Sequence, residues 1–89
     1  MTEELLDIRM SVADPRDEAS VERLASLTGT HAPAGPFVMA ELDGEPVAAI
    51  SIADGRTVAH PYLYPHTGVL LTLHLRRLEA RMIGSIWAS

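Results

Sequence analysis

The chain contains no cysteine and no lysine, and its few aromatic residues are one Trp, one Phe and two Tyr among 89 residues. Without cysteine, the protein can form no disulfide bond, thiolate metal ligand or cysteine nucleophile. With so few aromatic residues, the hydrophobic core must be aliphatic. All seven basic residues are arginine, which indicates a GC-rich genome rather than a recognition surface.

The length and composition are those of one small domain. A chain of 89 residues with 47% hydrophobic and 21% charged residues is expected to form a single globular domain over residues 1–89. The first four residues are Met-Thr-Glu-Glu, which is not the basic start of a signal peptide, and no uncharged apolar run approaches the ~18 residues of a membrane span. We therefore expect a soluble protein, with the cytoplasm as the default compartment.

The charges are divided unevenly along the chain. The net charge is −5. Residues 1–54 hold eleven acidic residues against three arginines, whereas residues 55–89 hold four arginines against Glu79. The acidic total argues against nucleic acid as a partner, and the basic C-terminal segment is suited to meet an acidic surface.

The first half of the chain predicts a strand followed by a helix. Apolar residues nearly alternate with polar ones over residues 5–12, which is the period of a half-buried strand. Asp14 and Pro15 then supply an N-cap and a first-position proline, so a helix should begin at Pro15 and end near Gly29. Residues 28–36 are polar and rich in proline and glycine, and we expect a loop there.

Three further strands and a long helix are expected after this loop. Residues 37–42 and 46–52 are apolar runs joined by Asp43-Gly44-Glu45, and Asp-Gly between apolar runs is a strong hairpin signal. A second Asp-Gly pair precedes a short strand at 57–60, and a helix should occupy about residues 67–88. The predicted fold is α+β, an antiparallel four-stranded sheet with the element order strand-helix-strand-strand-strand-helix.

The C-terminal helix has two apolar stripes. At 100° per residue, one stripe comprises Leu71, Leu75, Leu78, Met82 and Ile86, and we expect it to pack on the sheet. The second stripe, on roughly the opposite side, comprises Val69, Leu73, Ala80, Ile83 and Trp87. One domain cannot cover both stripes, so the second should contact a partner. The predicted interface residues are Leu73, Ile83, Ile86 and Trp87.

Two other interpretations of this helix remain open. The first is a core helix with some exposed apolar residues, which is ordinary on protein surfaces. The second is a helix that lies in a membrane surface, to which Trp87 and the arginines are suited. Glu79 and the short polar face weigh against this second interpretation.

Motifs for chemistry are few. The last three histidines are too far apart in sequence to form the i,i+4 pair of a zinc helix: His60, His66 and His74. Ser51 has no Gly-x-Ser-x-Gly context, so we expect a structural hydroxyl. Glu41 and Asp43 lie near one another on the hairpin, where carboxylates are usually solvated and a general base is the alternative. We assign no catalytic residue and no metal ligand.

Several segments carry a family resemblance. One is Ile8-Arg9-Met10 followed by Asp14-Pro15-Arg16-Asp17, and the others are residues 38–50 and the turn Asp54-Gly55-Arg56. Over roughly residues 5–80 they resemble the N-terminal half of the GNAT superfamily of N-acetyltransferases. The resemblance is to short GNAT-like proteins of actinobacterial type. It implies the same α+β fold.

The departures from the GNAT pattern bear on function. In GNAT enzymes an Arg/Gln-x-x-Gly-x-Gly/Ala turn binds the pyrophosphate of coenzyme A through backbone N–H groups. The matching stretch here, residues 64–69, keeps Gly68 and lacks the arginine and the other small residue. Thr67, Gly68 and Val69 are the candidate donors that remain. The later strands of the fold have no counterpart after Ser89, so the resemblance implies a truncated domain that does not catalyse acetyl transfer alone.

The expected function is therefore that of a non-catalytic protein-interaction module without a cofactor. It would form a homodimer or serve as a small accessory subunit of a larger assembly. The alternative is an acetyl-CoA-binding N-acetyltransferase or acyl-CoA sensor that a second subunit completes. DNA binding by an antitoxin-like regulator is disfavoured by the acidic net charge.

Overall fold

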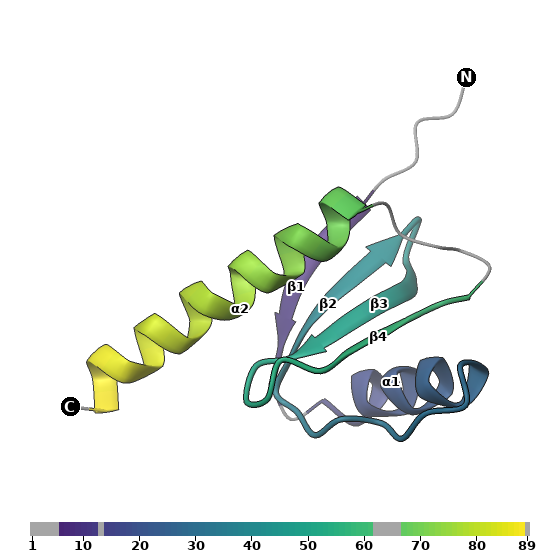
Figure 1. The fold of residues 1–89 in the computed structure, drawn as a ribbon, viewed down its shortest axis with the longest axis horizontal. Coiled ribbons are helices and arrows are strands. Elements are labelled where there is room, and N and C mark those ends of the chain that lie inside the picture. Colours follow the sequence, from purple (N-terminus) through teal and green to yellow (C-terminus); the bar gives the residue numbers. More distant parts are fainter. Residues whose placement is uncertain (1–5, 13, 62–66, 89) are drawn as a thin grey trace.

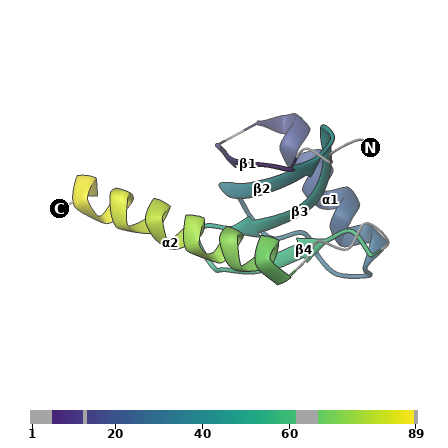
Figure 2. The same ribbon diagram turned by 90° about the horizontal axis from the view of Figure 1, so that it is seen from above.

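A computed structural model describes residues 6–12, 14–61 and 67–88; for residue 67 and residues 84–88 it describes the backbone alone. The fold is α+β, as predicted: a four-stranded antiparallel sheet in the order β1-β2-β3-β4, with one helix on each face (Figures 1 and 2). The elements are β1 (Leu6–Ser11), α1 (Pro15–Leu27), β2 (Phe37–Leu42), β3 (Glu45–Ser51), β4 (Thr57–Ala59) and α2 (Thr67–Ala88). All six elements lie within one or two residues of the predicted bounds. Leu5, predicted to start the first strand, lies outside the described residues.

Helix α1 begins and ends where the sequence predicts. The carboxylate of Asp14 accepts a hydrogen bond from the backbone N–H of Arg16 at 2.9 Å, which satisfies one of the free donors of the first turn. Pro15 occupies the start of the helix, where its missing N–H is not needed. At the other end the hydroxyl of Thr28 donates to carbonyls of the last turn, and Gly29 turns the chain away with a φ of 71°.

The hairpin between β2 and β3 has a two-residue turn, Asp43-Gly44. Both residues have positive φ, 51° and 82°, as a type I′ turn requires. Strand β3 begins at Glu45, one residue earlier than predicted, so Pro46 is its second residue. Pro46 pairs with Glu41 at a shift of register in β2, and a proline without an N–H is tolerated at such an irregularity.

The core has two layers, one on each face of the sheet. Alternate strand residues point to opposite faces, which divides the buried side chains into two groups. The layer beneath α1 comprises Val21, Leu24, Ala25, Phe37, Met39, Ala49 and Val58. The layer beneath α2 comprises Val38, Ala40, Val47, Ala48, Ile50 and Leu73. Phe37 is the one aromatic residue in either layer, so the expectation of an aliphatic core is confirmed for the described residues.

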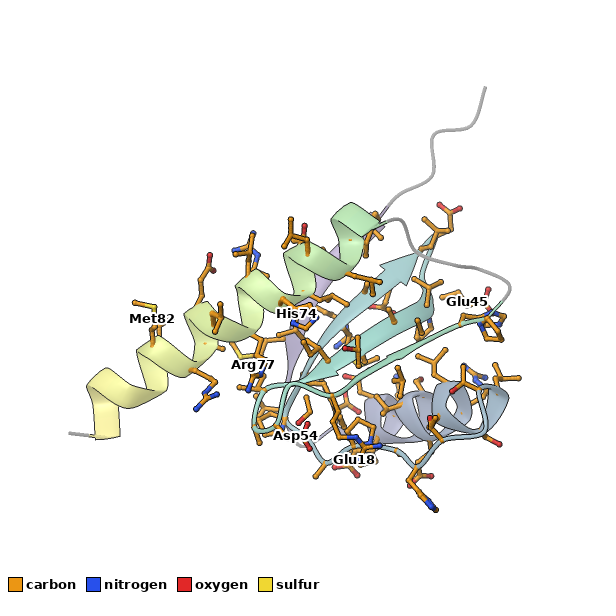
Figure 3. The ribbon with its side chains drawn as sticks, viewed as in Figure 1. Glu18, Glu45, Asp54, His74, Arg77 and Met82 are labelled. Atoms are coloured by element: carbon orange, nitrogen blue, oxygen red, sulfur yellow. The ribbon has the colours of Figure 1, made fainter. Side chains whose placement is uncertain are left out.

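Arg77 ties α2 to the end of β3. Its Nε donates to the carbonyl oxygens of Ser51 at 3.1 Å and Ile52 at 3.0 Å, and its Nη2 donates to that of Ala53 at 3.4 Å. Figure 3 shows the Arg77 side chain extending from α2 toward the turn that contains Asp54. The guanidinium thus adds charged donors to backbone carbonyls at the end of β3, where that of Ser51 also accepts from the N–H of Gly55, and it anchors α2 to this end of the sheet.

Candidate interaction surface

The rotation of α2 is the reverse of the sequence prediction. The stripe expected to pack on the sheet faces solvent instead: Leu71, Leu75, Leu78 and Met82 are 60%, 52%, 50% and 65% exposed. Leu73, from the opposite stripe, is 0% exposed and belongs to the core. The prediction that one domain cannot cover both stripes is confirmed, but the assignment of the stripes was wrong.

The physical reason lies in Arg77. Its guanidinium finds acceptors at the end of β3, and this turns its side of α2 toward the sheet. Val69 and Leu70 then pack against the core layer of the sheet. The larger leucines of the other stripe are left outside.

The exposed residues of α2 form a continuous row, which we call the outer stripe: Leu71, Leu75, Leu78 and Met82. Their spacing of four, three and four residues is the heptad spacing of a helix that pairs with another helix. Figure 1 shows that the C-terminal half of α2 projects past the sheet, and Figure 3 shows Met82 on this projecting part. The outer stripe is therefore reachable along its whole length.

A groove lies between the projecting half of α2 and the first two strands. Its volume is about 340 Å³. Its lining is Ile8, Arg9, Met10, Val38, Arg76, Glu79, Ala80 and Ile83. Ile83 is 54% exposed at its rim, and the Nη1 of Arg76 bonds Glu79 at 3.2 Å beside it. This opening exists because α2 diverges from the sheet while β1 continues beneath it.

The predicted interface residues are thus distributed unequally. Leu73 is buried against the protein's own sheet, so it is not available to a partner; this part of the prediction is contradicted by its burial. Ile83 stays exposed at the groove and remains a candidate. Ile86 and Trp87 lie in α2, but their side chains fall outside the described part of the structure. The leucines of the outer stripe are exposed where apolar periodicity alone predicts core positions, although their heptad spacing is visible in the sequence.

A polar cluster that the sequence did not predict joins β1, α1 and β2. The Nη atoms of Arg9 bond both oxygens of Asp17 at 2.8 and 2.6 Å, and its Nε bonds Glu41 at 2.6 Å. Ser11 donates a further hydrogen bond to Asp17. Asp17 is only 4% exposed. The bidentate pair therefore holds the start of α1 against the first strand.

The hydrogen bonds of this cluster shift the pKa values of Asp17 and Arg9 in opposite directions. The hydrogen bonds from Arg9 are the main reason that the pKa of Asp17 falls from an ordinary value of 3.8 to about 2, and Ser11 lowers it further. Burial opposes this by favouring the neutral acid. The two carboxylates in turn raise the pKa of Arg9. A carboxylate held ionised by a permanent cation is a structural anchor and is poorly suited to accept a proton in catalysis.

The candidate donors for a pyrophosphate lie at the start of α2. Thr67, Gly68 and Val69 form its first turn, and a Cβ atom added to Gly68 would meet no heavy atom of a described residue within 4 Å. The backbone is therefore open to approach from that side, as a phosphate-binding turn requires. Residues 64–66, which would form the rest of the turn, lie outside the described residues.

The other polar candidates have structural contacts. Ser51 is fully buried and its Oγ donates to the carbonyl of Ala34 at 2.8 Å, which holds the loop after α1 against β3. Glu41 is committed to Arg9, and Asp43 occupies the hairpin turn. No three residues of the kinds that bind metals come together within the described residues.

Comparison with protein-family models, with curated proteins and with solved structures finds no match. In the part of the chain that the structure describes, no helix combines the length and apolar character needed to cross a bilayer. The outer stripe of α2 and the adjoining groove are the features that any account of function must explain.

Proposed function

We propose that the protein is a non-catalytic interaction module that docks another polypeptide through the outer stripe of α2. The observation that carries this proposal is the row of four large apolar side chains, each at least half exposed, on a helix that projects past its own sheet. An apolar row of this kind, rather than singly scattered residues, marks a protein-contacting surface. The assembly is a homodimer or the attachment of a small accessory subunit to a larger assembly.

The free energy of association favours a partner that contributes an apolar stripe of similar size. Full burial of a Leu or Met side chain contributes roughly 1.5–3 kcal/mol, so four half-exposed side chains contribute on the order of 3–6 kcal/mol. Association itself costs about 4–15 kcal/mol. One stripe alone offsets only the low end of this cost, whereas two stripes that bury each other double the gain. A second copy of α2 is therefore the first occupant to test.

The resemblance to GNAT proteins supports the proposal only through the order of strands and helices. The order of the strands and helices is the one expected for the first part of a GNAT domain, and a module of that kind would keep the scaffold without the chemistry. The missing arginine in the stretch 64–69 supports this, because a GNAT enzyme uses that turn to bind the cofactor.

A second candidate function is acyl-CoA binding by a chain that another subunit completes. The open approach to Gly68 at the start of α2 favours it. In this case a ligand carrying a pyrophosphate, such as acetyl-CoA, would contact the backbone of Thr67, Gly68 and Val69. Ligand binding would then raise the melting temperature or change the assembly state, which the interaction proposal does not require.

The experiment is a measurement of solution mass by light scattering over a range of concentrations, with and without acetyl-CoA. The double variant Leu75→Glu/Met82→Glu places two charges in the outer stripe. The matched control is Leu27→Glu, because Leu27 is a similarly exposed leucine, 48%, at the end of α1 on the other face of the sheet.

The expected result is a lower mass for the double variant than for the wild type and for Leu27→Glu, with the wild-type mass unaffected by acetyl-CoA. A wild-type chain that stays monomeric at all concentrations would contradict self-association through α2. A mass or melting temperature that changes with acetyl-CoA would favour the second candidate instead.

A further inference from the structure

Strand β1 forms one edge of the sheet. It pairs with β2 on one side, and no described residue pairs with its other side. Leu6 and Met10, on the face that α2 occupies, are 43% and 54% exposed. An edge strand with exposed apolar side chains and unpaired backbone groups is a ready template for another strand, and natural proteins usually protect such an edge.

The charges of β1 are incompletely neutralised by the residues that the structure describes. Asp7 lies directly opposite Glu41 in the pairing of β1 with β2, and like charges in opposed positions destabilise a sheet. Glu41 is neutralised by Arg9 at 2.6 Å, but Asp7 is exposed and makes no ion pair with a described residue. Arg9 remains partly open to solvent, with 41% of its side chain exposed.

We propose that β1 pairs antiparallel with β1 of a second copy, about a two-fold axis that passes between Ile8 and the partner's Ile8. In this register Asp7 faces the partner's Arg9, and Leu6 faces the partner's Met10. Each pair occurs twice because a two-fold interface is self-complementary. The result is a continuous eight-stranded sheet, in which Asp7 gains the cation that its own sheet does not provide.

The sequence of β1 selects this register over its neighbours. Centring the axis on Arg9 would place the two arginines opposite each other, and centring it on Asp7 would do the same for the two aspartates. A slip by one residue would place Asp7 against Met10 and Ile8 against Arg9, because side chains alternate between the two faces. Only the axis at Ile8 joins apolar pairs on one face and opposite charges on the other.

The groove beside α2 is consistent with an added strand. Ile8 and Met10 line its floor, and their partners across the two-fold axis, the partner's Ile8 and the partner's Leu6, would extend that floor on the same face of the sheet. The outer stripe of α2 is not part of this contact. The inference therefore goes beyond the proposed function, and either one can fail without the other.

The absence of cysteine allows a direct test by disulfide cross-linking. In the variant Ile8→Cys the two thiols would stand directly opposite, and opposed Cα atoms in antiparallel strands are ~4.5–5.5 Å apart, within the range of a disulfide. The matched control is Met10→Cys, whose two thiols would be four residues out of register, roughly 14 Å apart. The wild-type surface is otherwise retained.

The charge pairing is tested by adding Asp7→Arg to the Ile8→Cys variant. Each of the two pairs of Asp7 with the partner's Arg9 then becomes a pair of arginines. Losing two attractive cross-strand contacts of about 0.7 kcal/mol each predicts about a tenfold loss of dimerisation. Glu22→Arg makes the same change of charge at an exposed position of α1 and serves as the control. Circular dichroism of each variant verifies that the fold is intact.

The expected result is rapid oxidation of the Ile8→Cys chain to a dimer, slow oxidation of Met10→Cys, and suppression by Asp7→Arg but not by Glu22→Arg. Persistent monomer in the Ile8→Cys chain, or equal rates for the two cysteine variants, would overturn the proposal. Adding Leu75→Glu/Met82→Glu should leave cross-linking unchanged. This separates the result from the test of the outer stripe.

Discussion

Arg77 of α2 and Gly55 of the turn after β3 pack against each other: a Cβ atom added to Gly55 would lie 3.0 Å from the guanidinium carbon of Arg77. Gly55 also has a φ of 77°, in the region that favours glycine. The contact brings the arginine close enough to bond three backbone carbonyls of the turn. We expect this contact to help set the rotation of α2 and, with it, the exposure of the outer stripe.

Replacing Gly55 by alanine should destabilise the fold in two ways. The positive φ costs roughly 1–2 kcal/mol for an alanine, and the new methyl group must displace Arg77. Gly44→Ala is the matched control, because Gly44 has a φ of 82° but no heavy atom of a described residue within 4 Å of an added Cβ. Urea unfolding should give a loss for Gly55→Ala about 1 kcal/mol larger than for Gly44→Ala. Equal losses would show that the contact with Arg77 has no energetic weight.

The substitution Arg77→Met tests the hydrogen bonds themselves. Methionine keeps much of the aliphatic stem and removes the donors, so the carbonyls of Ile52 and Ala53 lose the guanidinium, and that of Ser51 keeps only its bond from the N–H of Gly55. Hydrogen bonds to charged groups contribute about 1.5–3 kcal/mol, and we expect a destabilisation of ~2 kcal/mol in chemical unfolding. Arg81→Met, at an exposed position of the same helix, should change stability by no more than about 0.5 kcal/mol. A neutral Arg77→Met would contradict the anchoring role.

The reversed stripes of α2 give opposite predictions for two leucines. Leu73→Ala removes a fully buried side chain and should cost about 2–5 kcal/mol of unfolding free energy through the cavity it leaves. Leu71→Ala, at a 60% exposed position, should cost less than about 1 kcal/mol in dilute protein. Thermal unfolding at low concentration measures both. A larger loss from Leu71→Ala would mean that α2 packs with the other stripe on the sheet.

Acid should weaken the anchor between Arg9 and Asp17. The pKa of Asp17 in the folded protein is about 2, below its ordinary value of 3.8, so the stabilisation is fully present above pH ~4 and is lost as the pH falls toward 2. A shift of this size corresponds to about 2 kcal/mol. Asp17→Asn should therefore be less stable than wild type by roughly that amount at pH 6, and the difference should shrink toward pH 2.

Glu22→Gln provides the control for the loss of one acidic charge on α1, since Glu22 is exposed. Its stability should follow that of the wild type at every pH. A difference between Asp17→Asn and wild type that stays constant from pH 6 to pH 2 would show that the carboxylate of Asp17 contributes nothing through its charge.

The sequence predicts those features of the fold that arise from neighbouring residues. Asp14-Pro15 specifies the start of α1 through its own capping bond, and Asp43-Gly44 specifies the hairpin through two positive φ angles. These signals need no information from the rest of the chain. The four strands and their antiparallel order follow from them and from the alternation of apolar residues.

The arrangement of the candidate interaction surface could not be predicted in the same way. Both stripes of α2 are apolar, so hydrophobic periodicity alone does not say which one faces the sheet. Which stripe faces the sheet is set by Arg77, whose hydrogen-bond acceptors lie more than twenty residues earlier in the sequence, at the end of β3. The cluster of Arg9, Asp17 and Glu41 likewise joins three separate elements. Such contacts become visible only when the fold brings distant segments together.

The central claim, that the outer stripe of α2 is the docking surface, can be tested by the reactivity of a single introduced cysteine. The chain has no other cysteine, so the variant Leu78→Cys reports on the stripe alone and Leu27→Cys reports on the opposite face. The account predicts that thiol labelling of the Leu78→Cys chain slows as protein concentration rises, while labelling of the Leu27→Cys chain does not. Equal, concentration-independent rates at the two positions would contradict it.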